Sequence, residues 1–212
     1  MDKPILEALG VADTGRKQPA EILTRDEVAA LARQCSVRAP TGLRNRALIA
    51  VMYRAGLRLD EALALKPADI NAQQGTVRVL HGKKDKDRTV SLDDGGMAIV
   101  QQWMARRSAL SLRNGLLFCT LDGKRVQPQY VRNLMKRLAL KAGIEKRVHP
   151  HGLRHTHAAE LAHEGWPMNL IQQQLGHSSL LTTDVYLRHI APAELIALGK
   201  SRKWDLDEGE PS

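Results

Sequence analysis

Aromatic side chains are scarce in this chain: three tyrosines, three tryptophans and one phenylalanine make up 3% of its 212 residues. A chemical role for a phenol therefore has few candidate residues. The only two cysteines, Cys35 and Cys119, lie in apolar company and cannot form a disulfide framework, which indicates core residues in a reducing compartment. Neither an apolar signal-peptide segment nor a run of about eighteen apolar residues is present, so we expect a cytoplasmic, nucleoid-associated protein without membrane contact.

Positive charge is in excess. Lysine and arginine number 32 against 23 aspartates and glutamates, which gives a net charge of +9, and the sequence pI is about 9.8. Because phosphate contacts release condensed counterions, this balance favours a polyanionic partner, although a merely soluble cationic protein would show the same balance. The 43% hydrophobic content is enough for one domain with a full core.

The periodicity of apolar residues predicts an α+β fold, predominantly α-helical with a small three-stranded antiparallel sheet. We expect an N-terminal arm or linker over 1–20, one folded domain over 21–200 and an acidic tail over 201–212. Strands are predicted at 76–80 and 88–92, around a cationic hairpin tip at 82–87, with 68–71 as a third short strand. Helices are predicted from the capping box at Thr24, then at 43–56, 57–65, 94–109, 128–142, 151–164, 167–175, 179–189 and 192–200.

The predicted helix at 128–142 combines an apolar stripe with a basic one. Its cations are Arg132, Lys136 and Arg137. Such a helix could rest its apolar side on the core and its basic side in a DNA groove, whereas an ordinary solvated face explains the pattern equally well.

Three short segments carry most of the chemical information: Ala55-Gly-Leu-Arg58-Leu-Asp-Glu61, His151-Gly-Leu-Arg154-His155, and Leu175-Gly-His177 followed by Thr182-Thr-Asp-Val-Tyr186. In this order and at these spacings they resemble the three signature boxes of the tyrosine recombinase, or phage integrase, catalytic domain. The hairpin Gly82-Lys83 resembles the lysine-bearing β-turn of that family. The resemblance covers roughly residues 24–190 and implies the DNA breaking-rejoining catalytic fold for the domain at 21–200.

The residue types suit attack on a phosphodiester. Two guanidinium groups, on Arg58 and Arg154, can hold both non-bridging oxygens by charge-assisted hydrogen bonds while staying protonated. The resemblance implies that Tyr186 is the nucleophile and forms a covalent 3′-phosphotyrosyl bond, which stores the energy of the cut strand without ATP or metal. Tyr53 and Tyr130 are instead expected to be half-buried core residues.

Proton transfer and orientation fall to four further residues in the family pattern. His151 would be the general base, because imidazole titrates near neutral pH, and His177 would hydrogen-bond the scissile phosphate. Lys83 aligns with the general acid that protonates the leaving 5′-oxygen. Glu61 would orient an arginine or the base and temper the positive charge.

The hairpin departs from the usual family pattern. Lys84 replaces a small turn residue and His81 is inserted before Gly82, so Lys84 and Lys86 compete with Lys83 for the role of the acid. We otherwise assign Lys84 and Lys86 to DNA binding.

A zinc site is the obvious rival interpretation of the histidine-rich stretch, which contains His149, His151, His155, His157 and His163. No HExxH or CxxC motif accompanies it, so we expect no metal and no other cofactor. His155 is expected to pack or hydrogen-bond inside the domain.

Together these features predict a metal- and ATP-independent site-specific DNA recombinase that acts on double-stranded DNA, takes no small-molecule substrate, and assembles as a synaptic tetramer on DNA from protomers that are monomeric in solution. A type IB topoisomerase, a non-catalytic DNA-binding regulator and a metallohydrolase remain as alternatives. The chain is either a natural catalytic-domain recombinase, like the fimbrial-switch invertases, or a fragment that lacks an N-terminal DNA-clamping domain.

Overall fold

The computed structural model describes residues 21–80, 87–112, 114–176 and 200. The proposed arm over 1–20, the tail over 201–212, the tip of the hairpin, the helix expected at 179–189 and all but the last residue of the one expected at 192–200 lie outside these residues. Within the described ranges no helix is long and apolar enough to cross a membrane.

Three helices form the N-terminal part: α2 (Arg25–Arg33), α3 (Pro40–Arg54) and α4 (Leu59–Ala64). The capping box predicted at the start of α2 is confirmed, since the Thr24 hydroxyl accepts from the Glu27 N–H at 3.1 Å and the Glu27 carboxylate accepts from the Thr24 N–H at 2.7 Å. After α3 the chain turns through Gly56, whose φ of +64° is a left-handed conformation that glycine adopts without strain. This turn places Arg58 at the N-cap of α4.

The sheet has the order β1 (Ile70–Asn71), β2 (Thr76–Val79) and β3 (Arg88–Ser91), and both pairings are antiparallel. The register pairs Val77 with Val90, so the buried valines share the face that meets the helices. The strand predicted at 68–71 is wrong in its first half, because a 3₁₀ turn, η1 (Pro67–Asp69), precedes β1. There the Asp69 carboxylate accepts from the Lys66 N–H at 2.8 Å and closes the turn.

Four helices follow, at positions close to those predicted: α5 (Asp94–Ala109), α6 (Pro128–Lys141), α7 (Pro150–His163) and α8 (Met168–Leu175). The core lies between α3, α5 and the sheet and includes the fully buried Trp103 and Phe118. The indole N–H of Trp103 donates to the Leu117 carbonyl at 2.9 Å, so its polar atom is satisfied inside the core.

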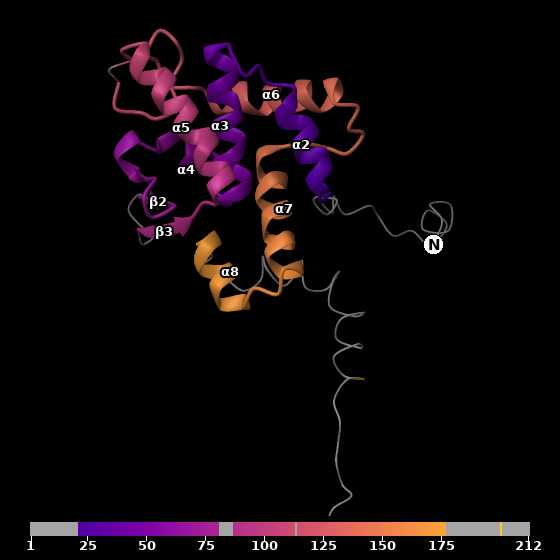
Figure 1. Cartoon of the computed structure of the whole chain (residues 1–212). Helices are drawn as coiled ribbons and strands as arrows, with labels where there is room; N and C mark the ends of the chain where they lie inside the picture. The colour runs from indigo at the N-terminus through magenta and orange to yellow at the C-terminus, as the bar shows by residue number, and fades with distance from the viewer. Residues whose placement is uncertain (1–20, 81–86, 113, 177–199, 201–212) are drawn as a thin grey trace, which may run out of the picture.

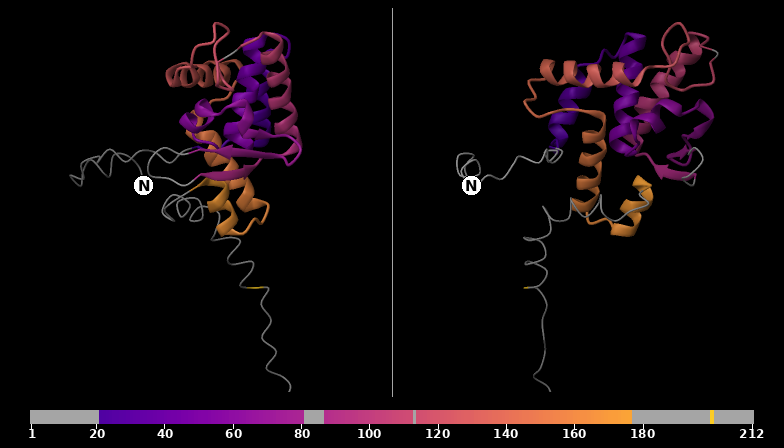
Figure 2. Two further views of the ribbon diagram at one scale, coloured as in Figure 1. Left: turned by 90° about the vertical axis from the view of Figure 1, so that its left-hand side faces the viewer. Right: turned by 180° about the vertical axis from the view of Figure 1, so that it is seen from behind.

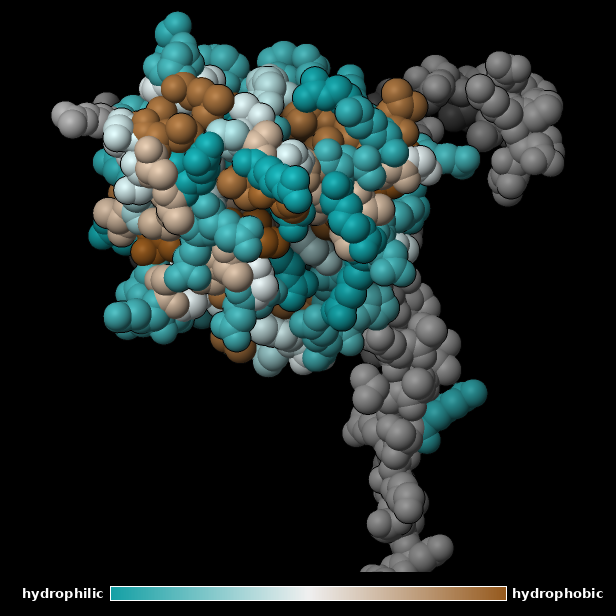
Figure 3. Space-filling model, turned by 45° about the horizontal axis from the view of Figure 1, so that its top comes forward, coloured by the Kyte–Doolittle hydropathy of each residue, from teal (hydrophilic) through white to brown (hydrophobic). Residues whose placement is uncertain are grey.

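Figures 1 and 2 show α3 and α5 running side by side and α7 next to α3, with α6 across one end of this bundle and α8 near the sheet at the other. The side chain of Gln174 in α8 pairs with the backbone of Ser91 in β3, accepting from its N–H at 3.0 Å and donating to its carbonyl at 2.9 Å. On the α6 end, Figure 3 shows hydrophobic residues as separate patches among hydrophilic ones. The fold is therefore predominantly helical with a small antiparallel sheet, as predicted.

Candidate functional site

Arg154 lies on the first half of α7 and is almost completely buried. Its guanidinium donates from Nη1 to the Gly56 carbonyl at 2.6 Å and from Nη2 to the Leu175 carbonyl at 2.5 Å. Burial, followed by the charge of Arg58, lowers the pKa of Arg154 to about 9, even though the carboxylate of Glu61 acts in the opposite direction. The guanidinium therefore stays protonated at neutral pH. These two bonds fix the fork between the end of α3 and the end of α8.

Arg58 reaches the same place from a different element. Its Nη2 donates to the Gly176 carbonyl at 3.2 Å, so the two arginines bind consecutive carbonyls at the C-terminal end of α8, where the helix dipole favours cations. The side chain of Arg58 is 39% exposed, unlike that of Arg154, so a ligand can reach it from solvent. The structure thus brings together the two predicted phosphate-holding arginines.

Glu61 is the carboxylate that balances these cations. It accepts from the backbone N–H and Nη1 of Arg58, both at 2.8 Å, and from Nη1 and Nη2 of Arg88 at 3.1 and 2.9 Å. Burial by itself raises the pKa of Glu61, but the hydrogen bonds from Arg88 and Arg58 outweigh it and bring the pKa down to about 2. Three guanidiniums therefore face one ionised carboxylate, and the site stays cationic.

The lowered pKa of Glu61 predicts a pH-dependent contribution to stability. Because the folded-state pKa of about 2 lies below the ordinary value of 4.5, this contribution is fully present above about pH 5 and is lost as the pH falls toward 2. It amounts to at most about 3 kcal/mol in the free energy of unfolding. Urea denaturation from pH 7 to pH 2 should show a flatter pH dependence for Glu61→Gln than for the wild type. Equal slopes would contradict the assignment.

His151 is an exposed residue in the first turn of α7, and its ring stands edge-on to that of His155, with centroids 4.0 Å apart. Burial, followed by the charges of Arg154, His149 and Arg58, lowers the pKa of His151 below 6.5. The imidazole is therefore mostly neutral at pH 7, the form that can accept a proton.

A groove of about 530 Å³ opens beside these residues, between α6 and the start of α7. Arg58 and His151 line one side, and Arg132 and Lys136 line the other from successive turns of α6. Arg147 also lines the groove. Arg137 does not; it is exposed, and its charge acts on the thiol of Cys35, which lies between α2 and α3. The basic stripe predicted on this helix is thus divided between two directions.

Several predicted site residues lie outside the described residues: Lys83, Lys84, Lys86, His177 and Tyr186.

The described part of the site ends at Gly176, whose carbonyl accepts a hydrogen bond from Arg58. Gly176 has a φ of +63°, and a Cβ there would stand 2.6 Å from the guanidinium carbon of Arg88, so a side chain at this position would strain the backbone and displace the Arg88 guanidinium. Among the residues that the structure describes, no three His, Cys, Asp or Glu side chains are grouped as metal ligands would be.

Sequence reasoning missed two members of the site. Arg88 was predicted only as a strand residue, yet its side chain is 11% exposed and binds Glu61. Arg147 stands in the loop before α7 and carries no motif of its own. A cation at the start of the strand that follows the hairpin was the available signal for Arg88, whereas no sequence signal identified Arg147.

Comparison with known proteins gives this geometry a context. A family model described as the phage integrase family matches residues 21–192. The tyrosine recombinase XerD of Ralstonia nicotianae is 36% identical over 188 residues, which cover 86% of this chain and 61% of that protein. The chain therefore spans about six tenths of the length of that relative.

Solved structures agree with the sequence match. The crystal structure of XerA recombinase superposes with a TM-score of 0.76 at 30% identity, covering 87% of this chain and 66% of the other. A post-cleavage complex of the XerH site-specific recombinase with its palindromic difH substrate gives a TM-score of 0.70 at 30% identity, covering 86% of this chain and 53% of the other. The match of the family model over most of the chain, together with these relatives, shows that the chain belongs to the phage integrase family.

Proposed function

We propose that this chain is the catalytic part of a site-specific DNA recombinase that cleaves and rejoins DNA through a 3′-phosphotyrosyl intermediate. The observation that carries the proposal is the convergence of Arg58 and Arg154 on consecutive carbonyls at the end of α8, beside a groove lined by His151 and by cationic side chains. The recombinases named above support strand exchange over supercoil relaxation.

In the proposed reaction the phenolic oxygen of Tyr186 attacks the phosphorus and the bond to the 5′-oxygen breaks. The proton of the phenol passes to His151, and Lys83 gives a proton to the leaving 5′-oxygen. Arg58 and Arg154 stabilise the charge that develops on the non-bridging oxygens. Attack by a 5′-hydroxyl on the phosphotyrosyl bond then reverses the step, so no external energy source is consumed.

The remaining assignments concern binding. Arg132 and Lys136, to which we add Arg147, would contact backbone phosphates; the proposal is supported by the position of all three in the lining of the groove. His177 would hydrogen-bond the scissile phosphate. Lys84, Lys86 and Arg137 remain predicted DNA contacts without support from the groove. We further propose that strand exchange takes place in a tetramer on two DNA sites, formed from protomers that are monomeric in solution.

Covalent trapping tests the proposal. The full chain is incubated with nicked duplex fragments of the DNA that flanks its own gene, so that a cleaved short strand diffuses away and the adduct cannot reverse. We expect a denaturant-resistant protein–DNA adduct in the presence of EDTA, and a nucleotide on the peptide that contains Tyr186 after digestion and mass spectrometry. A trapped site placed twice on one plasmid should then recombine. Absence of any adduct, or a nucleotide on another residue, would contradict the proposal.

A further inference from the structure

The face of α7 that carries Arg154 continues toward the end of α3. Arg154, His157 and Glu160 are spaced three residues apart, and each contacts the segment from Tyr53 to Gly56. This segment leads directly into the Gly56 carbonyl that Arg154 binds and into Arg58. The relative position of α7 and the end of α3 therefore determines how the two arginines face one another.

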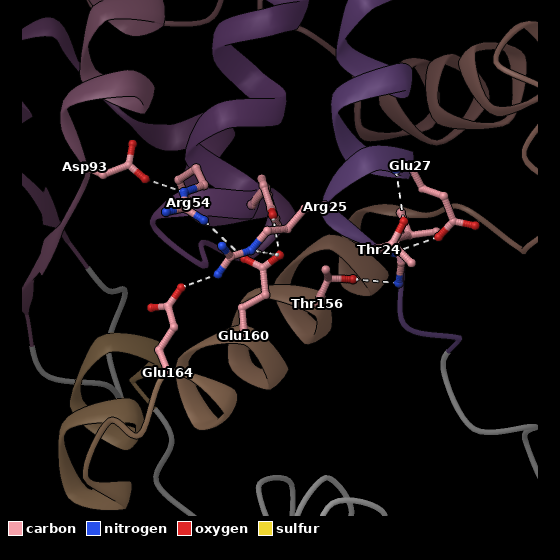
Figure 4. A network of polar contacts seen from close by, with 10 residues as sticks. Thr24, Arg25, Glu27, Arg54, Asp93, Thr156, Glu160 and Glu164 are labelled. Carbon is pink, nitrogen blue, oxygen red and sulfur yellow. Dashed lines mark hydrogen bonds and ion pairs between the residues drawn. The ribbon is translucent and has the colours of Figure 1, made fainter.

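Glu160 makes a second polar link along this face. Its side chain is only 12% exposed, and it accepts from the Tyr53 hydroxyl at 2.5 Å and from Arg54 Nη1 at 3.1 Å. Arg54 also pairs with Asp93, the N-cap of α5, and Arg25 of α2 stands 3.5 Å from Glu160, so Glu160 belongs to a network that joins four helices (Figure 4). Burial, followed by the hydrogen bond to Glu160, raises the pKa of Tyr53, which keeps its proton on the phenol.

His157 fills the space between this network and Arg154. It is 4% exposed, and neither ring nitrogen has a hydrogen-bond partner among the described residues. Its Cδ2 would stand 2.7 Å from a Cβ on Gly56, so the ring packs directly against that turn. Because the imidazole makes no directional bond there, orientation along this face depends on the bond from Arg154 to Gly56 at one end and on the bonds of Glu160 at the other.

We propose that Glu160 is a positioning residue: its bonds to Tyr53 and Arg54 hold the end of α3 against α7, so that Arg154 and Arg58 meet the scissile phosphate in the geometry that cleavage requires. The inference rests on the proposed function. Glu160 lies two helical turns beyond Arg154 and touches no part of the groove. Its loss should therefore lower the rate of the chemical step and leave DNA affinity nearly unchanged.

Glu160→Gln tests this proposal, because glutamine keeps the size of the side chain but removes the charge and presents an N–H₂ group that conflicts with the donors. Glu164→Gln is the matched control, since Glu164 is 37% exposed and, among the described residues, pairs only with Arg25, whose side chain is 64% exposed and touches Glu160 only at 3.5 Å. On a trapped target site we expect the single-turnover cleavage rate of Glu160→Gln to fall about tenfold, with a Kd for DNA within about twofold of the wild type. The control should match the wild type in both.

A double-mutant cycle separates positioning from general loss of structure. If Glu160 acts through Arg154, Glu160→Gln should lower the cleavage rate by less than about threefold in an Arg154→Lys background. A purely structural defect would lower the cleavage rate by the same factor in both backgrounds. If Glu160→Gln does not fold, Tyr53→Phe replaces it in the test. This variant removes a single bond to Glu160 and keeps every charge, so its cleavage rate should fall in the same way but by less. Equal rates for wild type and Glu160→Gln, or a loss of affinity equal to the loss of rate, would overturn the proposal. Failure of the wild type to cleave would instead count against the proposed function.

Discussion

Replacing Tyr186 by phenylalanine is expected to abolish covalent protein–DNA adducts on a target site identified by covalent trapping, and to change the Kd for that DNA by no more than about twofold. The substitution removes one oxygen atom, the proposed nucleophile, and leaves the ring in place. No other group of the proposed site can form a phosphotyrosyl bond, so the loss should reach the detection limit. Adduct yield on denaturing gels and affinity by gel shift measure the two quantities.

The structure removes the other two tyrosines from competition. The Tyr53 hydroxyl donates to the Glu160 carboxylate, and its raised pKa makes it a poor source of phenolate. The Tyr130 hydroxyl accepts from Arg44 Nη2 at 3.0 Å and from the Asn45 side chain at 3.2 Å, and the guanidinium of Arg44 stands over its ring. Both phenols therefore have structural partners away from Arg58 and Arg154.

Tyr130→Phe is the matched control, because it removes the same atom from a residue outside the site. It should form adducts at the wild-type rate, and Tyr53→Phe should still form them, although more slowly. Adducts that persist in Tyr186→Phe and disappear in Tyr130→Phe would reassign the nucleophile and defeat the proposed reaction.

Arg154→Ala is expected to have the second largest effect, and it should affect both stability and chemistry. The substitution leaves the carbonyls of Gly56 and Leu175 without their donor and opens a cavity, so the free energy of unfolding should fall by about 2 to 4 kcal/mol. Loss of a guanidinium from the developing charge should lower the cleavage rate by about 10² to 10³ on its own. Urea denaturation and single-turnover cleavage measure the two effects.

Arg58→Ala separates the two contributions. Arg58 is more exposed, so its replacement should cost less stability while it removes a comparable share of the cleavage rate. Arg154→Lys keeps the charge but not the planar fork, and it should remain well below the wild type because one ammonium cannot span both carbonyls and a phosphate. Wild-type cleavage by Arg154→Lys would show that charge alone is sufficient at this position.

Most of the fold could be predicted from the sequence, because local signals and burial agree in it. The capping box at Thr24 fixed the start of α2, and the apolar spacing of Val131, Leu134 and Leu138 placed α6 on the core. The strand predicted at 68–71 failed where the Asp69 side chain captured a backbone N–H, a local competition that apolar periodicity does not reveal.

The site was predictable only in part, for a physical reason. Arg58, Glu61, His151 and Arg154 stand in motifs, so their grouping could be expected. Arg88 and Glu160 join the site or its support through contacts between distant segments: Arg88 reaches Glu61 from the sheet, and Glu160 reaches Arg54 from another helix. Such pairings depend on tertiary packing between distant segments, which no local sequence pattern reveals.

The placement of both arginines at the end of α8 has a mechanical consequence. The guanidiniums proposed to grip the phosphate also hold the peptide groups of Leu175 and Gly176, from which the backbone continues toward His177 and Tyr186. If either arginine shifted when it bound DNA, it would therefore move the start of the segment that leads to Tyr186, the proposed nucleophile. In the proposed reaction, the binding of DNA and the approach of the nucleophile would thus both depend on Arg58 and Arg154.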